Sequence, residues 1–249
     1  MIPIARRLLS RELGRVTRRA ALAVCVLQPS LAAAQDITAA RYTDPTTRYA
    51  HGVLGDAIEH ETLRLQTGDG RVLGITLPQT DVFEDTEPRL ADLDGDGDGD
   101  NEVIVVQSND RLGAKLAVYD AAGLVAQTPN IGRSNRWLAP LGAADLDQNG
   151  TVDIAYIDRP HLAKILRIWR FEAGGLIHTA DLHGYTNHRI GERDIAGGIR
   201  TCNRMPEMIV ATADWRDLVA IRFDGTGFAV KRLGADTSRA AFAAAMVCK

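Results

Sequence analysis

Residues 166–177 read Leu-Arg-Ile-Trp-Arg-Phe-Glu-Ala-Gly-Gly-Leu-Ile, which is a β-type run, a glycine turn and a second β-type run. Three other segments of the chain share this pattern. The four turn glycines, Gly70, Gly123, Gly175 and Gly227, are separated by 53, 52 and 52 residues. Because the loops between the copies differ in composition, this regular spacing indicates an internal repeat of about 52 residues.

A second β-type run precedes each copy, and no stretch after residue 35 has a convincing helical period. These runs are residues 51–54, 103–106, 154–157 and 208–211. The sequence therefore predicts an all-β fold. Repeats of roughly 40–50 residues with about four strands each are typical of β-propellers, whose blades close radially. We therefore expect a four-bladed propeller.

The innermost strand of each blade should come before these runs, and residues 88–91, 136–144 and 189–196 are candidates for three blades. The first blade has no such candidate. Residues 237–247 resemble 133–143 in position and polarity, so we expect the C-terminus to supply the missing strand and close the ring. The expected blades are residues 45–80 with 237–248, 85–130, 133–183 and 186–235. The alternative is that the alanine-rich tail forms a terminal helix and the blades form an open arc.

Residues 1–34 have the three parts of a signal peptide. Six arginines stand before an apolar run at 20–27, and small residues at 31–34 precede Gln35. We expect cleavage before Gln35 and export to the periplasm or the medium, by either the general secretory or the twin-arginine route. An uncleaved anchor is the alternative, but the apolar run is shorter than the roughly 20 residues that cross a bilayer. Residues 35–249 should then form one monomeric domain without a membrane span.

Composition excludes several classes of protein. The chain has 249 residues, of which 45% are hydrophobic, and this excludes a disordered chain. Its three cysteines form no CxxC pair, which excludes zinc ribbons. Loss of residues 1–34 would change the formal charge from −3 to −8, so we expect no binding to nucleic acid. No GxSxG or HExxH motif is present, and the chain is therefore expected not to be an enzyme.

Two acidic loops carry the identifiable chemistry. Residues 145–153 read Asp-Leu-Asp-Gln-Asn-Gly-Thr-Val-Asp, and residues 92–102 of the preceding repeat read Asp-Leu-Asp-Gly-Asp-Gly-Asp-Gly-Asp-Asn-Glu. Alternating carboxylates repel one another and are stable together chiefly around a hard cation such as Ca²⁺. An EF-hand would need a glutamate at position 12 of the loop, where this chain has Tyr156. The alternative is a solvated acidic loop without metal.

With these loops, residues 45–248 resemble the FG-GAP or VCBS repeat family, the calcium-loop blades of integrin α-subunit propellers and of many exported bacterial proteins. The family motif is Asp-x-Asp-x-Asp-Gly-x-x-Asp/Glu before a β-strand. The resemblance implies a calcium site in the third repeat with the ligands Asp145, Asp147, Asn149, Thr151 through its carbonyl oxygen, and Asp153.

The loop of the second repeat has two extra residues, so two sets of ligands remain open. The preferred set is Asp94, Asp96, Asp98 and Glu102, which keeps the motif's spacing to the strand, and the other is Asp92, Asp94, Asp96 and Asp100. The fourth repeat keeps only Glu207 of the motif, and the first repeat has lost its loop to the chain terminus. The resemblance therefore implies two calcium sites.

The cysteines suggest a further link in the fourth repeat. Cys25 leaves with the signal peptide, while Cys202 lies in the degenerate loop and Cys248 at the end of the proposed closing strand. Both would lie on the same face of neighbouring blades, so a Cys202–Cys248 disulfide is expected in an oxidising compartment. The alternative is two unpaired or intermolecular thiols.

The segments that enter the inner strands should lie opposite the calcium loops. There Arg136, Arg189 and Arg239 could form a positive rim that attracts a carboxylate, a sulfated sugar or an acidic partner segment. The alternative is that these arginines are solvated or pair with nearby acids. We expect an exported calcium-binding propeller that binds a protein or glycan partner or acts as a scaffold. The other hypotheses are a propeller hydrolase that uses His188 at the central channel, and a purely structural envelope protein.

Overall fold

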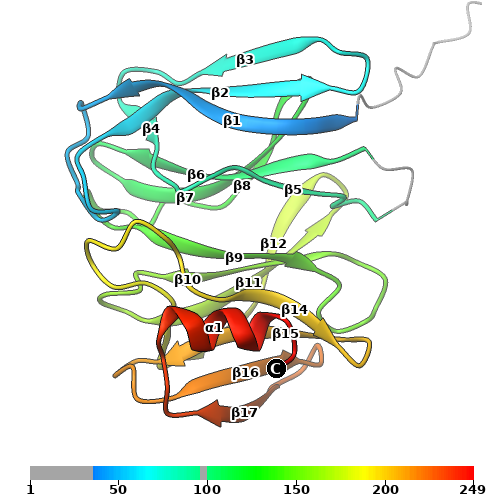
Figure 1. The fold of residues 1–249 in the computed structure, drawn as a ribbon. Helices are drawn as coiled ribbons and strands as arrows, with labels where there is room; N and C mark the ends of the chain where they lie inside the picture. The colour runs from blue at the N-terminus through cyan, green and yellow to red at the C-terminus, as the bar shows by residue number, and fades with distance from the viewer. Residues whose placement is uncertain (1–35, 96–99) are drawn as a thin grey trace, which may run out of the picture. The chain divides into compact units, whose positions relative to one another are not determined.

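The computed structural model describes residues 36–95 and 100–249 (Figure 1). The predicted signal peptide, residues 1–34, and the predicted ligands Asp96 and Asp98 lie outside the described residues. The described part contains seventeen strands and one short helix, so the predicted all-β class is confirmed. No helix in this part is long and apolar enough to cross a membrane.

The second, third and fourth repeats each form a four-stranded antiparallel meander in chain order. The second contains β5 (Arg89–Ala91), β6 (Glu102–Asn109), β7 (Gly113–Asp120) and β8 (Gly123–Gln127). The third contains β9 (Leu138–Ala144), β10 (Asp153–Asp158), β11 (Ile165–Glu172) and β12 (Gly175–His183). The fourth contains β14 (Gly198–Cys202), β15 (Met205–Thr212), β16 (Leu218–Phe223) and β17 (Phe228–Gly234), and β13 (Tyr185–Thr186) pairs with the far end of β15.

Of the predicted inner strands, 88–91 and 136–144 are confirmed as β5 and β9, but 189–196 is wrong. The backbone of that segment bonds elsewhere, because Glu192 N donates to Arg189 O and Gly191 N donates to Val53 O. The inner strand of the fourth repeat is β14, which lies inside the predicted degenerate loop. The loop shortens to a two-residue turn at Asn203 and Arg204, whose φ angles of 54° and 66° suit a type I′ hairpin.

The first repeat contains β1 (Ile37–Thr46), β2 (Glu59–Thr67) and β3 (Val72–Thr76), and β4 (Asp81–Phe83) joins it to β6 of the second repeat. The predicted strand at 51–54 is wrong, because this segment is a turn in which Gly52 has a φ of 66°. The strand β1 takes its place beside β2, so the first repeat begins at residue 37 rather than 45.

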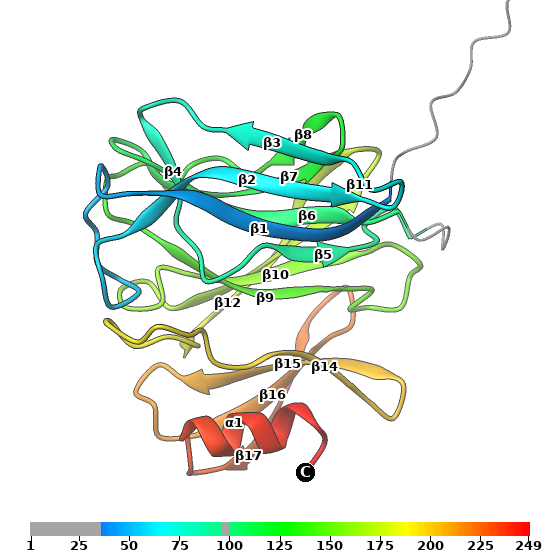
Figure 2. The same ribbon diagram turned by 45° about the horizontal axis from the view of Figure 1, so that its top comes forward.

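The predicted closing strand at 237–248 is also wrong, because α1 (Arg239–Met246) occupies this segment. The Ser238 side chain accepts a hydrogen bond from Ala241 N and caps a run rich in alanine, the residue with the highest helix propensity. Phe242 and Ala245 of α1 pack on Ile209 and Ala220, so the helix covers the outer face of the fourth sheet (Figures 1 and 2). The C-terminus therefore does not supply the inner strand of the first repeat.

The hydrophobic core lies between consecutive repeats. Along β6, Val103 and Val105 face the first repeat, whereas Ile104 and Val106 face the third. Further clusters fill the space between the sheets of the third and fourth repeats and under α1. A strand that is buried on both faces reads as a continuous apolar run, which explains the run Val103–Val106 in β6.

Candidate functional site

The acidic loop of the third repeat joins the end of β9 to the start of β10. Asp145 shapes this loop, since its two carboxylate oxygens accept hydrogen bonds from Asn149 N at 2.9 Å and Gly150 N at 2.8 Å. The Asn149 side chain accepts a bond from Thr151 N at 2.8 Å and donates one to Asp147 Oδ2 at 3.0 Å. The loop is thus held by its own polar groups, with the predicted ligands in one turn.

Asp147 and Asp153 approach the same guanidinium group. Arg170 on β11 donates to Asp147 Oδ2 at 2.6 Å and to Asp153 Oδ1 at 3.1 Å. The other oxygens of these acids, Asp147 Oδ1 and Asp153 Oδ2, are buried without a hydrogen-bond partner. Burial raises the pKa of Asp153, although Arg170 acts in the opposite direction. Two buried carboxylates therefore share one cation and keep one unsatisfied oxygen each.

The acidic loop of the second repeat follows the same plan at its two ends. Asp92 accepts a bond from Gly95 N at 2.8 Å, and Glu102 accepts one from Leu93 N at 2.9 Å. Burial raises the pKa of Glu102, and the charges of Asp94 and Asp92 raise it further. Glu102 begins β6 as Asp153 begins β10, so the two acids occupy equivalent positions.

The donor set of the third-repeat loop suits Ca²⁺ chemically, because it offers carboxylate, amide and carbonyl oxygens. Within residues 36–95 and 100–249, no three His, Cys, Asp or Glu side chains are gathered in a metal-binding arrangement. In the third repeat the guanidinium of Arg170 lies between two of the predicted ligands. The loop of the third repeat thus offers oxygen ligands that suit Ca²⁺, and the guanidinium of Arg170 already contacts two of them.

The fourth repeat uses arginine at the equivalent place. The cross-strand register places Arg170 opposite Asp153, and Arg222, 52 residues after Arg170, contacts Glu207. Glu207 is buried and accepts bonds from Arg200 at 2.7 Å and from Arg222 at 2.7 Å. In the second repeat the neighbouring strand β7 ends in Asp120, whose carboxylate accepts bonds from Ala122 N and Gly123 N of the β7–β8 turn. The third and fourth repeats therefore share an arginine beside their last acid.

The predicted disulfide is confirmed, since Cys202 and Cys248 are bonded with their Cα atoms 6.2 Å apart. The bond connects the β14–β15 turn to the residues that follow α1, rather than to a closing strand. It therefore fixes the helix against the fourth sheet.

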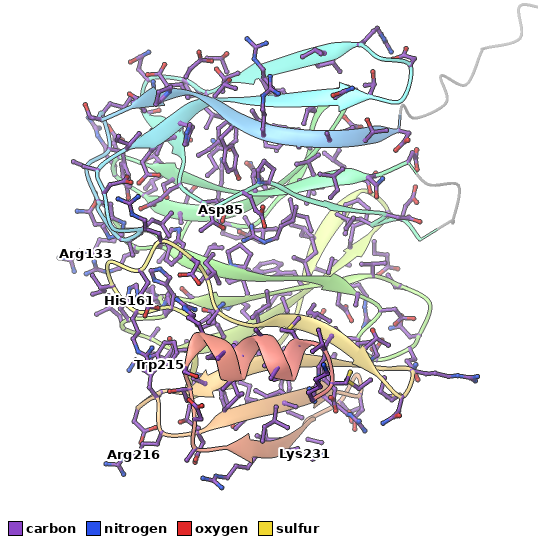
Figure 3. The ribbon with its side chains drawn as sticks, in the orientation of Figure 1. Asp85, Arg133, His161, Trp215, Arg216 and Lys231 are labelled. Atoms are coloured by element: carbon purple, nitrogen blue, oxygen red, sulfur yellow. A yellow bond between two sulfur atoms is a disulfide. The ribbon has the colours of Figure 1, made fainter. Side chains whose placement is uncertain are left out.

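A pocket of about 260 Å³ lies at the opposite end of the strands. Its lining residues are His51, Asn135, Arg136, Trp137, Arg159, Pro160, His161, Leu162 and Ile190. Leu138 pairs with Asp158 at this end of the third sheet, and Ala144 pairs with Asp153 at the acidic end. The two sites are therefore separated by the length of β9, about 20 Å. Figure 3 shows Arg133, His161 and Trp215 on the side where the pocket lies.

Hydrogen bonds behind the pocket fix the rings that line it. Buried Glu84 holds His51 Nδ1 at 2.6 Å and accepts a bond from Ser108, and Trp137 Nε1 donates to the Glu84 carbonyl at 2.8 Å. Burial raises the pKa of Glu84, and the bond to His51 opposes this shift. His51 is therefore oriented by a buried acid.

A pair of histidines lies on the other side of Trp137. His188 is fully buried and bonds through Nε2 to the Glu192 carbonyl at 2.8 Å and through Nδ1 to His161 Nε2 at 3.0 Å. The His161 ring stacks on Trp137. Burial lowers the pKa of His161 to about 4, and His188 lowers it as well. Burial also lowers the pKa of His188, so both rings are uncharged at neutral pH.

The three arginines of the predicted rim differ in their partners. Arg239 pairs with Glu192 and with Asp194 at 3.1 Å. Arg189 lies 3.7 Å above the centre of the Trp215 ring and 3.5 Å from Glu192. Arg136 lines the pocket, and no acid of the described part lies within ion-pair distance of it. Two of the arginines are therefore paired with acids, whereas the Arg136 guanidinium donates to a carbonyl oxygen, Asn135 O, at 2.9 Å.

Sequence reasoning missed His51, Glu84 and His161. They belong to three different loops and share no motif, so only the fold reveals their proximity. Two lining residues have left-handed backbone, Asn135 with φ 55° and Arg159 with φ 47°. This conformation is unfavourable for Arg159, and such backbone strain is common at functional sites. It is a property of the fold and could not be read from the sequence.

Glu59 near these acids gives a prediction for pH dependence. Burial raises the pKa of Glu59 to about 9, with contributions from Glu84, Asp56 and Asp85. The folded protein thus keeps a proton that the unfolded chain releases near pH 4.5, and the free energy of unfolding falls as pH rises between these values. We therefore expect the stability of Glu59→Gln, measured relative to the unchanged protein, to rise by about 4 kcal/mol between pH 4.5 and pH 7.5.

The measurement is urea unfolding of both proteins from pH 4.5 to 8. Glu61→Gln, a change on the same strand at a partly exposed acid, is the control and should leave the slope unchanged. Parallel stability curves for Glu59→Gln and the unchanged protein would show that Glu59 is ionised in the folded state.

Comparison with models of known protein families finds no match for the chain, and comparison with curated proteins also finds none.

Proposed function

We propose that this protein is an exported, calcium-stabilised repeat protein of the FG-GAP or VCBS type. Its blades would be those of a propeller in which α1, rather than a closing strand, covers the last sheet. The acidic loops would bind structural Ca²⁺, and the opposite end of the strands would bind a protein or glycan partner. The unsatisfied oxygens of Asp147 and Asp153, in a loop with the family pattern, carry the calcium assignment.

The convergence of loops supports the propeller-like arrangement of the blades. His51 comes from the first repeat, Glu84 from the link to the second, His161 from the third and His188 from the entry to the fourth. Gly191 N donates to Val53 O at 3.0 Å, so the first and fourth repeats are in contact at this end. In propellers the loops of all blades meet at the mouth of a central channel, which is a common place for ligands.

Removal of calcium tests the proposal. A ligand that binds only the folded state stabilises it by mass action, so EDTA should lower the melting temperature of the mature protein. The double change Asp147→Ala, Asp96→Ala should remove most of this calcium-dependent shift. The matched control is Asp214→Ala, an exposed acid in the β15–β16 turn at the other end of the strands, which should keep the full shift. Equal calcium-dependent shifts in all three proteins would count against both sites.

A hydrolase is the second candidate function, and the Glu84–His51 pair is the observation that favours it. A histidine held by a buried carboxylate is suited to accept a proton from water. His188 does not fit that role, because both of its ring nitrogens are already bonded. Hydrolysis of sugar or phosphate esters that is lost in His51→Ala would support this alternative.

A further inference from the structure

We propose that the pocket between His51 and His161 binds an acidic sugar residue, a hydroxylated ring that carries one carboxylate. This inference deepens the proposed function, because it names the chemistry of the ligand at the end opposite the acidic loops. It does not depend on calcium being the ion in those loops.

The charge of the lining favours an anion. Arg136 lies in the lining without an acidic partner in the described part of the chain. Arg159 is neutralised by Asp158, which it contacts at 2.9 and 2.8 Å. No carboxylate belongs to the lining, since Glu84 and Asp158 lie behind it. A ligand carboxylate would therefore find one unpaired guanidinium, and bonds between such charged groups are the strong ones.

The histidines favour hydroxyl groups on the same ligand. His188 Nε2 bonds to a carbonyl oxygen and must carry the proton, so His188 Nδ1 accepts and His161 Nε2 donates. This assigns the lone pair of His161 to Nδ1, which remains an acceptor at neutral pH because the pKa of the ring is about 4. The lining thus offers a neutral imidazole acceptor and an arginine, which suits a ligand that carries both a hydroxyl and a carboxylate.

The size and the apolar part of the pocket favour a single ring. Its volume of about 260 Å³ is just below the range of roughly 300–1,000 Å³ that is usual for small-molecule sites. Pro160, Leu162 and Ile190 supply apolar surface, and the last two side chains are exposed. The lining rings are held by buried hydrogen bonds, so little order has to be gained on binding.

Calorimetric titration of the calcium-saturated mature protein tests the inference. Glucuronate is the probe, glucose lacks the carboxylate, and benzoate lacks the hydroxyls. We expect glucuronate to bind at least about tenfold more tightly than either of the other two. A free sugar acid and the end of an acidic polysaccharide share this chemistry, and a short oligouronate titrated in parallel distinguishes them.

Arg136→Gln should weaken glucuronate binding about tenfold or more and leave glucose unaffected. Arg133→Gln, an exposed arginine three residues earlier, is the matched control and should change neither. The melting temperature of each variant shows that it is folded. Absence of glucuronate binding to the folded protein, equal binding of glucose, or equal loss in Arg133→Gln would overturn the inference. A normal calcium-dependent melting shift in the same samples would show that the calcium proposal holds independently.

Discussion

Replacing Arg170 by methionine is expected to tighten calcium binding by the third-repeat loop by about tenfold or more. The guanidinium contacts both Asp147 and Asp153, so an incoming cation has to displace it or share its ligands. A change to methionine keeps an unbranched apolar stem and removes the charge. Each lost ion pair between partly buried groups is of the order of 1–2 kcal/mol, which corresponds to such a change in affinity.

The same substitution should make the protein depend more on calcium. Without Arg170, two largely buried carboxylates would face each other with no cation, and the calcium-free protein should melt at a lower temperature. Isothermal titration measures the affinity, and thermal melting with and without EDTA measures the dependence.

The control is Arg222→Met, at the equivalent position of the fourth repeat. It should lower the stability equally in calcium and in EDTA, because no calcium is expected at Glu207. Unchanged calcium affinity in Arg170→Met would mean that the guanidinium does not compete with the ion. Weaker binding would mean that Arg170 positions the ligands. Absence of calcium binding in both the variant and the unchanged protein would reject the calcium site itself.

Local patterns predicted most of the strands. The runs at 103–106, 154–157 and 208–211 became β6, β10 and β15, because a strand buried on both faces has to be apolar throughout. The segment 51–54 looked similar in sequence, but it is a turn with Gly52 in a left-handed conformation. The strand β1, not this segment, pairs with β2. The order of the strands was therefore easier to predict than the ends of the first repeat.

The C-terminal segment shows why position within a repeat is a weak guide. Its resemblance to residues 133–143 suggested a strand, but the serine cap and the alanine run favour a helix. Packing agrees with this, since Phe242 of α1 covers the apolar face formed by Ile209 and Ala220. Helix propensity and burial against the fourth repeat's sheet both favour a helix here, whereas the resemblance to residues 133–143 had suggested a strand.

The acidic loops could be recognised in the sequence, but the arginine that pairs with the acids of the third-repeat loop could not. Arg170 follows Asp153 by seventeen residues and meets it only through the register of β10 and β11. The histidine pocket was missed for a similar reason, because His51 and His161 belong to loops of different repeats. Sites assembled from separate loops need the fold before their chemistry can be recognised.

Replacing Glu207 by glutamine is expected to cost about 3–5 kcal/mol of stability, the usual effect of breaking a buried ion pair. Glu207 is 3% exposed and joins Arg200 to Arg222, and the Arg200 side chain is itself almost fully buried. Glutamine preserves the size of the side chain but leaves Arg200 without its carboxylate. Urea unfolding measures the loss, which should be the same with and without calcium.

The matched control is Asp217→Asn, which breaks the exposed pair with Arg232 and should cost less than about 1 kcal/mol. Loss of similar size in both variants would show that burial does not strengthen the Glu207 network.

The pH dependence of the stability of Glu207→Gln and of the unchanged protein shows whether the loss comes from the charge of Glu207 or from its packing. Burial raises the pKa of Glu207, but Arg200 and Arg222 outweigh it and hold the pKa below its usual 4.5. A lowered pKa in the folded state means that the ion pairs contribute fully above pH 4.5 and that this contribution is lost as pH falls through the folded value. The stabilities of Glu207→Gln and the unchanged protein should therefore converge in acid. A constant difference down to the lowest pH at which both fold would assign the effect to packing, and the fourth repeat would then be held by its disulfide and α1 rather than by arginine.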